Sequence, residues 1–172
     1  SEAQKIVTAD PHAFNAIKND YHNSKLPPLE HLTQYVDRKI KSSDLTLKPL
    51  EDPGKIYTYH DPCYLGRHNK VYDAPREAMD AIPGLKRVEM EKCRDRSLCC
   101  SGGGLMLFYE PEEEERMSVI RVKMAAEAGA NVIVTACPFC LVNIEDAIKV
   151  AKMEDTMEAI DFSELIARQI EI

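Results

Sequence analysis

Five of the six cysteines in this chain follow a spacing that could bring their thiolates to one site. Cys63 is followed by the adjacent pair Cys99 and Cys100, and then by Cys137 and Cys140, which gives the pattern C-x35-C-C-x36-C-x2-C. Thiolate is the preferred ligand of iron–sulfur clusters and of zinc. An adjacent pair combined with a C-x2-C turn is a strong signal, so we expect these five cysteines to form one metal-cluster site.

Other residues near the pattern could support it. The glycine run Gly102-Gly103-Gly104 carries no Cβ atoms, so backbone amides there can approach sulfur closely. Cys93 lies outside the spacing, and we expect a surface or loop thiol rather than a sixth ligand. His60 could donate a hydrogen bond to sulfur or relay protons, but a histidine that is simply satisfied at a strand end is the favoured interpretation.

The composition is that of an ordinary globular protein. Charged residues make up 30% and hydrophobic residues 44% of the 172 residues, enough for one full-sized core. The net charge of −7 argues against nucleic acid as a partner, because phosphate binding needs clustered Lys and Arg. Disulfides are disfavoured in a reducing cytosol, so six cysteines favour metal binding or thiol catalysis over disulfides or scattered buried thiols.

Nothing in the sequence directs the chain to secretion or into a membrane. No apolar run approaches the ~18–20 residues that span a bilayer, and the first residues, Ser1–Lys5, form no apolar signal region. The chain does not begin with Met, so we expect a processed chain or part of a longer protein. We expect a cytoplasmic location, with membrane association through partner subunits.

Strands and helices alternate along most of the chain. Strands are predicted over Lys55–His60, Lys86–Met90, Asn131–Ala136 and Met157–Asp161. Helices are predicted over Pro111–Ala128, Leu141–Met153 and Phe162–Ile170, the first with Met117, Ile120, Met124 and Ala128 on its apolar face. This order predicts an α/β fold: a Rossmann-like parallel sheet with helices on both faces. The cysteines fall where loops leave strands or enter helices, so we expect the site at the carboxyl edge of the sheet.

A short repeat suggests two copies of the same unit. Residues Ile6–Ala13 align with Ile133–Cys140, 127 residues later, although chance similarity over eight residues is the alternative. Asp10 and Ala13 stand where the second copy has cysteines, so we expect this half-site to bind no cluster. We therefore predict the tail of a degenerate first domain at 1–40, packed as a helical remnant, a linker at 41–54 and an intact domain at 55–172.

The motifs resemble the cysteine-rich CCG domain of heterodisulfide reductase catalytic subunits and related iron–sulfur oxidoreductases. The resemblance is carried by Asp61–Arg67, the Cys99-Cys100 block and Leu105-Met106. Within that family the chain is similar to the HdrD type, and most to the DsrK type of sulfur-metabolising bacteria, because members with a single intact motif match the loss at Asp10 and Ala13.

The resemblance implies a cofactor, a reaction and partners. It implies a [4Fe–4S] cluster, cubane or non-cubane, held by Cys63, Cys99, Cys100, Cys137 and Cys140. It also implies reduction of a disulfide-type substrate, or of a small thiol protein, with electrons relayed from clusters elsewhere. The partners would be other subunits of a redox complex, including a membrane quinone or haem subunit. We expect this part of such an enzyme to be inactive alone.

Ser101 departs from the family pattern, which usually has glycine directly after the two cysteines. Serine can follow the same backbone as glycine only if its φ angle is negative.

Two other functions remain open on the residues alone. One is an electron relay that touches no substrate, as in the iron–sulfur subunits of glycolate or lactate oxidation. The other is a structural zinc module, for which four thiolates are enough and a fifth is superfluous.

Overall fold

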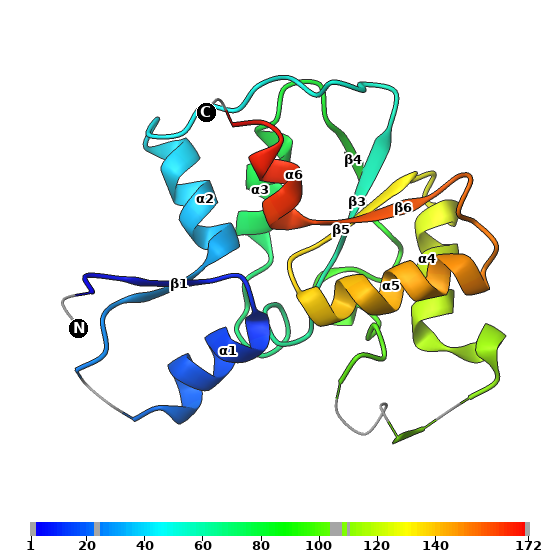
Figure 1. Cartoon of the computed structure of the whole chain (residues 1–172), viewed down its shortest axis with the longest axis horizontal. Helices are drawn as coiled ribbons and strands as arrows, with labels where there is room; N and C mark the ends of the chain where they lie inside the picture. The colour runs from blue at the N-terminus through cyan, green and yellow to red at the C-terminus, as the bar shows by residue number, and fades with distance from the viewer. Residues whose placement is uncertain (1–2, 23–24, 104–107, 110, 171–172) are drawn as a thin grey trace.

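The chain folds around a four-stranded parallel sheet and a smaller two-stranded parallel sheet (Figure 1). The computed structural model describes residues 3–22, 25–103, 108–109 and 111–170. The larger sheet has the strand order β4-β3-β5-β6. Its strands are β3 (Ile56–His60), β4 (Lys86–Val88), β5 (Val132–Thr135) and β6 (Glu158–Asp161), and its helices are α3 (Asp73–Asp80), α4 (Met117–Glu127), α5 (Pro138–Val150) and α6 (Phe162–Ala167).

Helices cover both faces of this sheet, so the predicted α/β fold is confirmed. In β5, Val132 and Val134 face one apolar core, to which α3 and α6 contribute, whereas Ile133 faces a second core formed with α4 and α5. All four residues of β5 are buried. A strand buried on both faces is typical of a parallel sheet, which explains the continuous apolar run in the sequence.

The register between β3 and β5 fixes where the following loops begin. The two strands pair in parallel, with Tyr57 opposite Val132 and His60 opposite Thr135. Both strands therefore end at the same level of the sheet. The chain segments that follow His60 and Thr135 leave the carboxyl edge side by side, as parallel pairing requires.

The expected strands are all present, but all three predicted helices differ from their predicted bounds, and α6 ends at Ala167 rather than at Ile170. Helix α4 begins at Met117 rather than near Pro111, because Arg116 is extended (φ −59°, ψ 133°) and Glu113–Glu115 form a separate 3-10 turn. Helix α5 begins at Pro138, since proline directly after the extended Cys137 suits the first helical position.

The predicted apolar face of α4 is confirmed at Met124 and Ala128, which pack in the core, but is wrong at Ile120. Ile120 is 37% exposed, and the buried side carries Ser118, Val119, Arg121, Val122, Met124 and Ala125. Periodicity misplaced the face because α4 carries apolar residues on most of its sides, so spacing alone does not select one. Helix α3, which has proline at its third residue, was not predicted.

The N-terminal region repeats the element order of the C-terminal one. Its elements are β1 (Ile6–Thr8), α1 (Pro11–Asn15, continued by a π-helical turn at Ala16–Asp20), β2 (Leu29–His31) and α2 (Leu32–Lys41). Strands β1 and β2 pair in parallel, as β5 and β6 do. The segment is thus a strand–helix–strand–helix unit rather than the helical remnant that we expected. The division into domains at 1–40, 41–54 and 55–172 stays a prediction.

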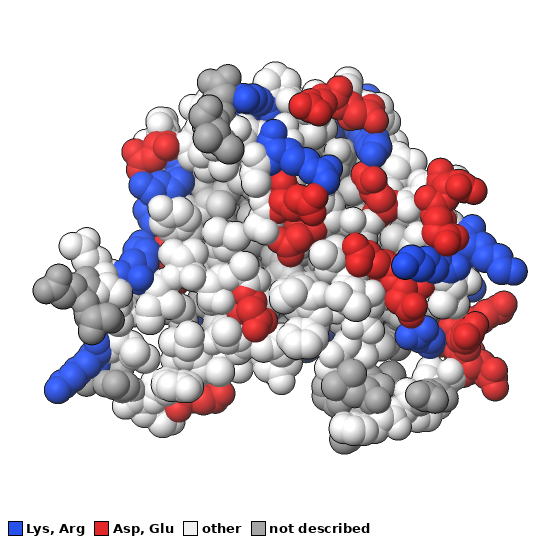
Figure 2. Space-filling model, viewed as in Figure 1, with Lys and Arg blue, Asp and Glu red and all other residues white. Residues whose placement is uncertain are grey.

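The surface is mixed in charge. Acidic and basic side chains are interspersed over the face in Figure 2, with acidic ones in the majority, in keeping with the net charge of −7. Among the described residues, no helix combines the length and the apolar character required to cross a bilayer.

Candidate metal centre

The five cysteines of the spacing pattern line one cavity at the carboxyl edge of the larger sheet. Cys63, Cys99, Cys100, Cys137 and Cys140 share this cavity with Pro11, His12, Pro62, Tyr64, Gly102, Gly103 and Phe139. Cys93 is not among the described residues that line it, as expected; it precedes the 3-10 turn Arg94–Arg96 instead.

Adjacent strand ends deliver three of these cysteines. Cys63 follows β3 after Asp61 and Pro62, and Cys137 follows β5 as the N-cap residue of α5. Cys140 lies in the first turn of α5 and is buried. The C-x2-C motif therefore spans a helix start, where free backbone N–H groups and the helix dipole favour thiolate.

The other two cysteines lie in the loop that follows the 3-10 turn. This loop is tied to the segment after β3 on both sides of the turn. The backbone N–H of Arg94 donates to Asp61 Oδ2 at 2.8 Å, and the Arg67 guanidinium donates to the Ser97 carbonyl oxygen at 2.6 Å. These bonds bring Cys99 and Cys100 to Cys63.

A buried ion-pair network holds the Asp61-Pro62-Cys63 turn itself. Arg76 donates to both carboxylate oxygens of Asp61, at 2.7 and 2.9 Å, and to both oxygens of Glu89, at 2.6 and 3.0 Å. Both Arg76 and Asp61 are buried. Such two-point contacts fix direction as well as distance, so the turn that carries Cys63 is rigidly placed.

The five sulfurs form a continuous series of neighbours. All the cysteines are free thiols. Cys99 lies within hydrogen-bonding reach of Cys63 and of Cys100, and Cys140 lies within reach of Cys100 and of Cys137. The two members of the adjacent pair therefore have different outer partners: Cys63 for Cys99, and Cys140 for Cys100.

This contact series divides the thiols into proton donors and acceptors. The pKa of Cys99 is lowered, because Cys100 and Cys63 donate hydrogen bonds to its sulfur. The pKa of Cys63 is raised, first by that hydrogen bond and then by burial. The pKa of Cys137 falls to about 7, chiefly through the Cys140 thiol and partly through backbone N–H groups at the start of α5. Thiolate, the metal-binding form, is thus favoured at Cys99 and Cys137.

The condition of a negative φ angle at Ser101 is not met. Ser101 has φ +64°, in the left-handed region where glycine is unstrained. The turn reverses the chain so that the Ser101 N–H donates to Cys99 Sγ at 3.3 Å. The usual glycine of the family pattern suits this conformation, whereas a serine there is strained by about 1–2 kcal/mol.

Gly102 fits a space with no room for a side chain. A Cβ atom there would lie 2.6 Å from Asn143 Nδ2, 3.2 Å from Cys100 Sγ and 3.3 Å from the Phe139 carbonyl oxygen. Only glycine therefore fits beside Cys100 at this position, and the approach of backbone amides to bridging sulfides stays a prediction. Gly104, Leu105 and Met106, which also carried the sequence interpretation, lie outside the described residues.

The degenerate motif copy contributes to the same cavity, which sequence reasoning missed. Asp10 Oδ1 accepts hydrogen bonds from the His12 backbone N–H at 2.9 Å and from His12 Nδ1 at 3.1 Å. One ligand atom each from Asp10, His12 and Cys137 lie within 4.8 Å of one another. The His12 ring packs against Tyr64 and Phe139, with centroids 4.4 and 5.2 Å away. The alignment of Asp10-Pro11-His12 with Cys137-Pro138-Phe139 was the feature of the sequence that could have indicated this contribution.

A buried histidine and arginine lie behind the cavity. His60 has a ring nitrogen within 4.8 Å of the sulfurs of Cys100 and Cys140, and its Nδ1 accepts a hydrogen bond from Arg121 Nε at 3.2 Å. The pKa of His60 is lowered to about 3, mainly by burial and then by the Arg121 charge, so the ring is neutral. Arg121 was also missed, although a charged residue within the apolar stretch of α4 was a signal.

The residues fit a metal–sulfur group. The cysteines supply only soft sulfur donors, which select iron–sulfur clusters or zinc over hard cations. Gly102 leaves space for the backbone to approach sulfur, and the buried Nη2 of Arg121 has no hydrogen-bond partner among the described residues. Arg121 is a buried cation that is separated from the cysteine sulfurs by the His60 ring, and this is compatible with a bound group of net negative charge.

Several known proteins are similar to this chain in sequence. The cysteine-rich domain family CCG matches residues 57–145. The probable iron–sulfur-binding oxidoreductase FadF of Bacillus subtilis is 38% identical over 99% of this chain, which spans 24% of that protein. The EtfAB:quinone oxidoreductase of Syntrophomonas wolfei is 33% identical over 98% of the chain and 24% of that protein. One subunit of the dihydromethanophenazine:CoB–CoM heterodisulfide reductase of Methanosarcina barkeri is 36% identical over 98% of the chain and 41% of that protein.

The chain thus spans from about a quarter to two fifths of the length of these relatives. The family match covers more than half of the chain and contains all five cysteines of the cavity. The chain belongs to the CCG cysteine-rich domain family.

Proposed function

We propose that Cys63, Cys99, Cys100, Cys137 and Cys140 hold an iron–sulfur cluster in an electron-transferring oxidoreductase. The observation that carries this proposal is the single cavity lined by all five. FadF is named as iron–sulfur-binding, and the relatives from Syntrophomonas and Methanosarcina are named as an oxidoreductase and as part of a reductase, which supports redox chemistry here.

We infer a [4Fe–4S] cluster rather than a zinc ion. Side chains of adjacent residues diverge along the backbone, so one metal ion is not readily bound by both Cys99 and Cys100. Their different outer partners, Cys63 and Cys140, support ligation of different irons by the two thiolates. A cubane takes four thiolates, so five thiolates with Cys99 and Cys100 on different irons favour an extended, non-cubane cluster. Tetrahedral zinc would leave one thiolate superfluous.

The reaction that we favour is reduction of a disulfide-type substrate. Cys63 and Cys99 are only partly buried, and His12, which is hydrogen-bonded to Asp10, lines the cavity. The cluster supplies electrons when bound. Cleavage of a disulfide to two thiols takes two electrons and two protons, and His12, oriented by Asp10, is placed to transfer a proton at the cavity. The heterodisulfide reductase relatives support this substrate class.

The second candidate is an electron relay without a substrate of its own. The names of two relatives favour it: EtfAB:quinone oxidoreductase from Syntrophomonas wolfei and a probable membrane-anchored ferredoxin from Chromohalobacter salexigens. These names, and that of the heterodisulfide reductase from Methanosarcina, also support our proposal that the partners are other subunits of a redox complex, including a membrane subunit. The closer likeness to the DsrK type stays a prediction.

Anaerobic reconstitution tests the proposal. The chain is loaded with iron and sulfide, its iron and acid-labile sulfide are measured, and electron paramagnetic resonance (EPR) spectra are recorded with and without a thiol. We expect about four irons and four sulfides per chain and a signal that changes with thiol. If the EPR signal of the loaded chain does not change when thiols or disulfides are added, the electron-relay function is favoured. Binding of one zinc ion in place of iron and sulfide contradicts both.

The Cys93→Ser variant is the matched control. It removes a thiol that does not line the cavity, so we expect unchanged iron and sulfide content.

A further inference from the structure

Arg121 is a buried cation with no dedicated counter-charge in the described part of the chain. Its exposed fraction is 0%. Its Nε donates to His60 Nδ1 at 3.2 Å and its Nη1 donates to the Lys92 carbonyl oxygen, whereas Nη2 has no partner among the described residues. The ion pairs found there do not include Arg121. A buried charge that lacks a partner is strongly unfavourable, so this arrangement needs an explanation.

The contrast with Arg76 shows that the fold does pair its other buried arginine. Arg76 is 2% exposed and holds both Asp61 and Glu89. These are the carboxylates whose fields reach Arg121, and both are already bound to Arg76. The field of the Cys93 thiol also reaches Arg121, and the sulfurs of Cys100 and Cys140 lie on the other side of His60.

His60 links Arg121 to the sulfurs. A guanidinium group can only donate hydrogen bonds, so Nδ1 of His60 must be the acceptor and the ring proton must sit on Nε2. The same ring has a nitrogen within 4.8 Å of the sulfurs of Cys100 and Cys140. His60 is buried, and its bond to Arg121 fixes the orientation of the ring that lies against the two sulfurs.

We propose that Arg121, acting through His60, raises the reduction potential of the group that the five cysteines hold. The inference rests on the proposed iron–sulfur function. Reduction by one electron from an external donor adds one negative charge to that group without breaking a bond. A fixed positive charge in a site of low dielectric constant stabilises this more negative state, and hydrogen bonds toward sulfur act in the same direction. Arg121 is a positioning residue, since His60 lies between it and the sulfurs.

Redox titration of reconstituted variants, followed by EPR, tests this role. Arg121→Met and Arg121→Gln remove the charge, and the glutamine keeps hydrogen-bonding capacity should the methionine variant not fold. At a fixed ambient potential we expect the ratio of reduced to oxidised cluster to fall at least tenfold in both, which is a shift of about 59 mV for one electron. Arg121→Lys keeps the cation and should stay within about twofold of the wild type.

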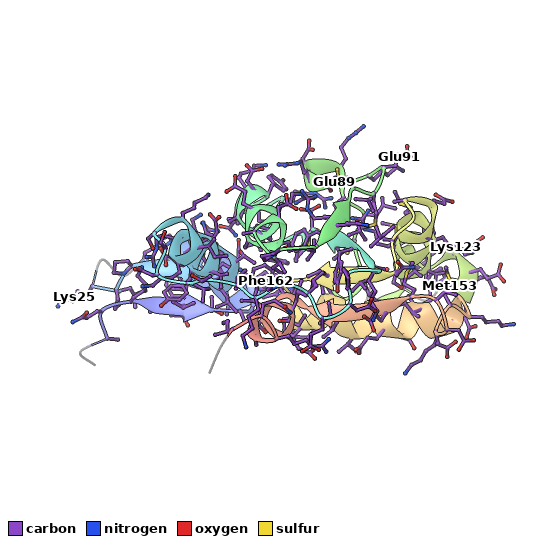
Figure 3. All side chains as sticks on the ribbon, turned by 90° about the horizontal axis from the view of Figure 1, so that it is seen from above. Lys25, Glu89, Glu91, Lys123, Met153 and Phe162 are labelled. Atoms are coloured by element: carbon purple, nitrogen blue, oxygen red, sulfur yellow. The ribbon has the colours of Figure 1, made fainter. Side chains whose placement is uncertain are left out.

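Lys123→Met is the control for net charge. Lys123 lies on the same helix α4, is exposed, and is labelled in Figure 3. This substitution removes one positive charge but leaves the buried site intact, so we expect less than a twofold change in the ratio, because solvent screens exposed charges.

The outcomes separate this inference from the function on which it rests. A wild-type chain that takes up no iron and sulfide overturns the proposed function and the inference with it. A loaded wild type whose Arg121→Gln variant titrates at the same potential overturns the inference alone. The inference also fails if Lys123→Met shifts the potential as far, or if Arg121→Lys shifts it as far as the neutral variants do.

Discussion

Cys99 and Cys100 are neighbours in sequence, yet their sulfurs have different outer contacts: Cys99 reaches Cys63, while Cys100 reaches Cys140. Cys99 is partly buried and Cys100 is 4% exposed. The adjacent pair thus joins the half of the site that follows β3 to the half that begins α5. This placement gives the two thiols separate roles in the proposed cluster, which single substitutions can test.

Replacing either Cys99 or Cys100 with serine should abolish the thiol-sensitive EPR signal. Each substitution removes a thiolate that no other cysteine can replace, because the two outer partners differ. The variants are reconstituted anaerobically, and spectra with and without thiol are compared with those of Cys93→Ser. A variant that keeps a normal cubane signal and still passes electrons supports the relay and contradicts the disulfide-reducing function.

His12→Phe should slow disulfide reduction by roughly a hundredfold, the scale of general acid catalysis. Phenylalanine occupies the matching place in the second motif copy, at Phe139, so the ring contacts with Tyr64 can be kept. Cluster reduction by a small chemical reductant should continue at the wild-type rate, since that step needs no proton from His12. Turnover equal to that of the wild type removes His12 from the mechanism.

Ser101→Gly should raise the free energy of unfolding by about 1 kcal/mol, because glycine adopts φ +64° without strain. Ser101→Ala is the control: it keeps the strained backbone and removes only the buried hydroxyl, which has no partner among the described residues. Urea unfolding of both variants measures the difference. Equal stability of the glycine and alanine variants contradicts the assigned strain.

Gly102→Ala should lower the iron content of the reconstituted chain. The added Cβ atom would lie 2.6 Å from Asn143 Nδ2 and 3.2 Å from Cys100 Sγ, so the adjacent thiol must move. We expect a loss of about 1–3 kcal/mol in stability, as for other overpacked sites. Gly103→Ala is the matched control, because its nearest neighbour, His12 Nε2, would lie 3.9 Å from the new atom. If Gly102→Ala and Gly103→Ala lose iron equally, the loss comes from a general disturbance of the loop, and the close contact of the Gly102 position with Cys100 is not its cause.

His31 should make the fold sensitive to acid. Its buried ring caps α2, with Nδ1 accepting from the Thr33 N–H at 3.3 Å, and burial lowers its pKa from 6.5 to about 4. Between pH 6.5 and pH 4, His31 therefore binds a proton in the unfolded chain but stays unprotonated in the folded chain. Stability should fall by up to roughly 3 kcal/mol as the pH drops from 6.5 to 4.

His31→Asn separates this effect from carboxylate titration. Asparagine can cap the helix but does not titrate, so the variant should lose less stability than the wild type over the same pH range. Denaturant unfolding at several pH values measures both chains. If the free energy of unfolding falls equally with pH in the two chains, His31 does not cause the loss of stability in acid.

Residue types and their spacing along the chain were enough to predict the parallel sheet and the grouping of the five cysteines. The apolar run Asn131–Ala136 has few ways to be buried other than as a central parallel strand, and the cysteine spacing placed five thiols at one sheet edge. The side of α4 that faces the core was not fully predictable, since that helix is apolar on most of its surface and the partners of the buried Arg121, His60 and the Lys92 carbonyl, are distant in sequence. Similarly, the φ angle of Ser101 depends on how its loop reaches Cys99, which involves residues distant in sequence.

The cysteines of the cavity come from segments separated by 35 and 36 residues. A group bound to all of them ties these long loops together, much as a covalent cross-link does, and so reduces the conformational entropy of the unfolded chain. Loading of the site is then also a step in folding. The segment between Cys63 and Cys99, which carries α3 and β4, would lose its restraint when the metal is oxidised away, so that proteolysis there becomes a readout of cluster loss.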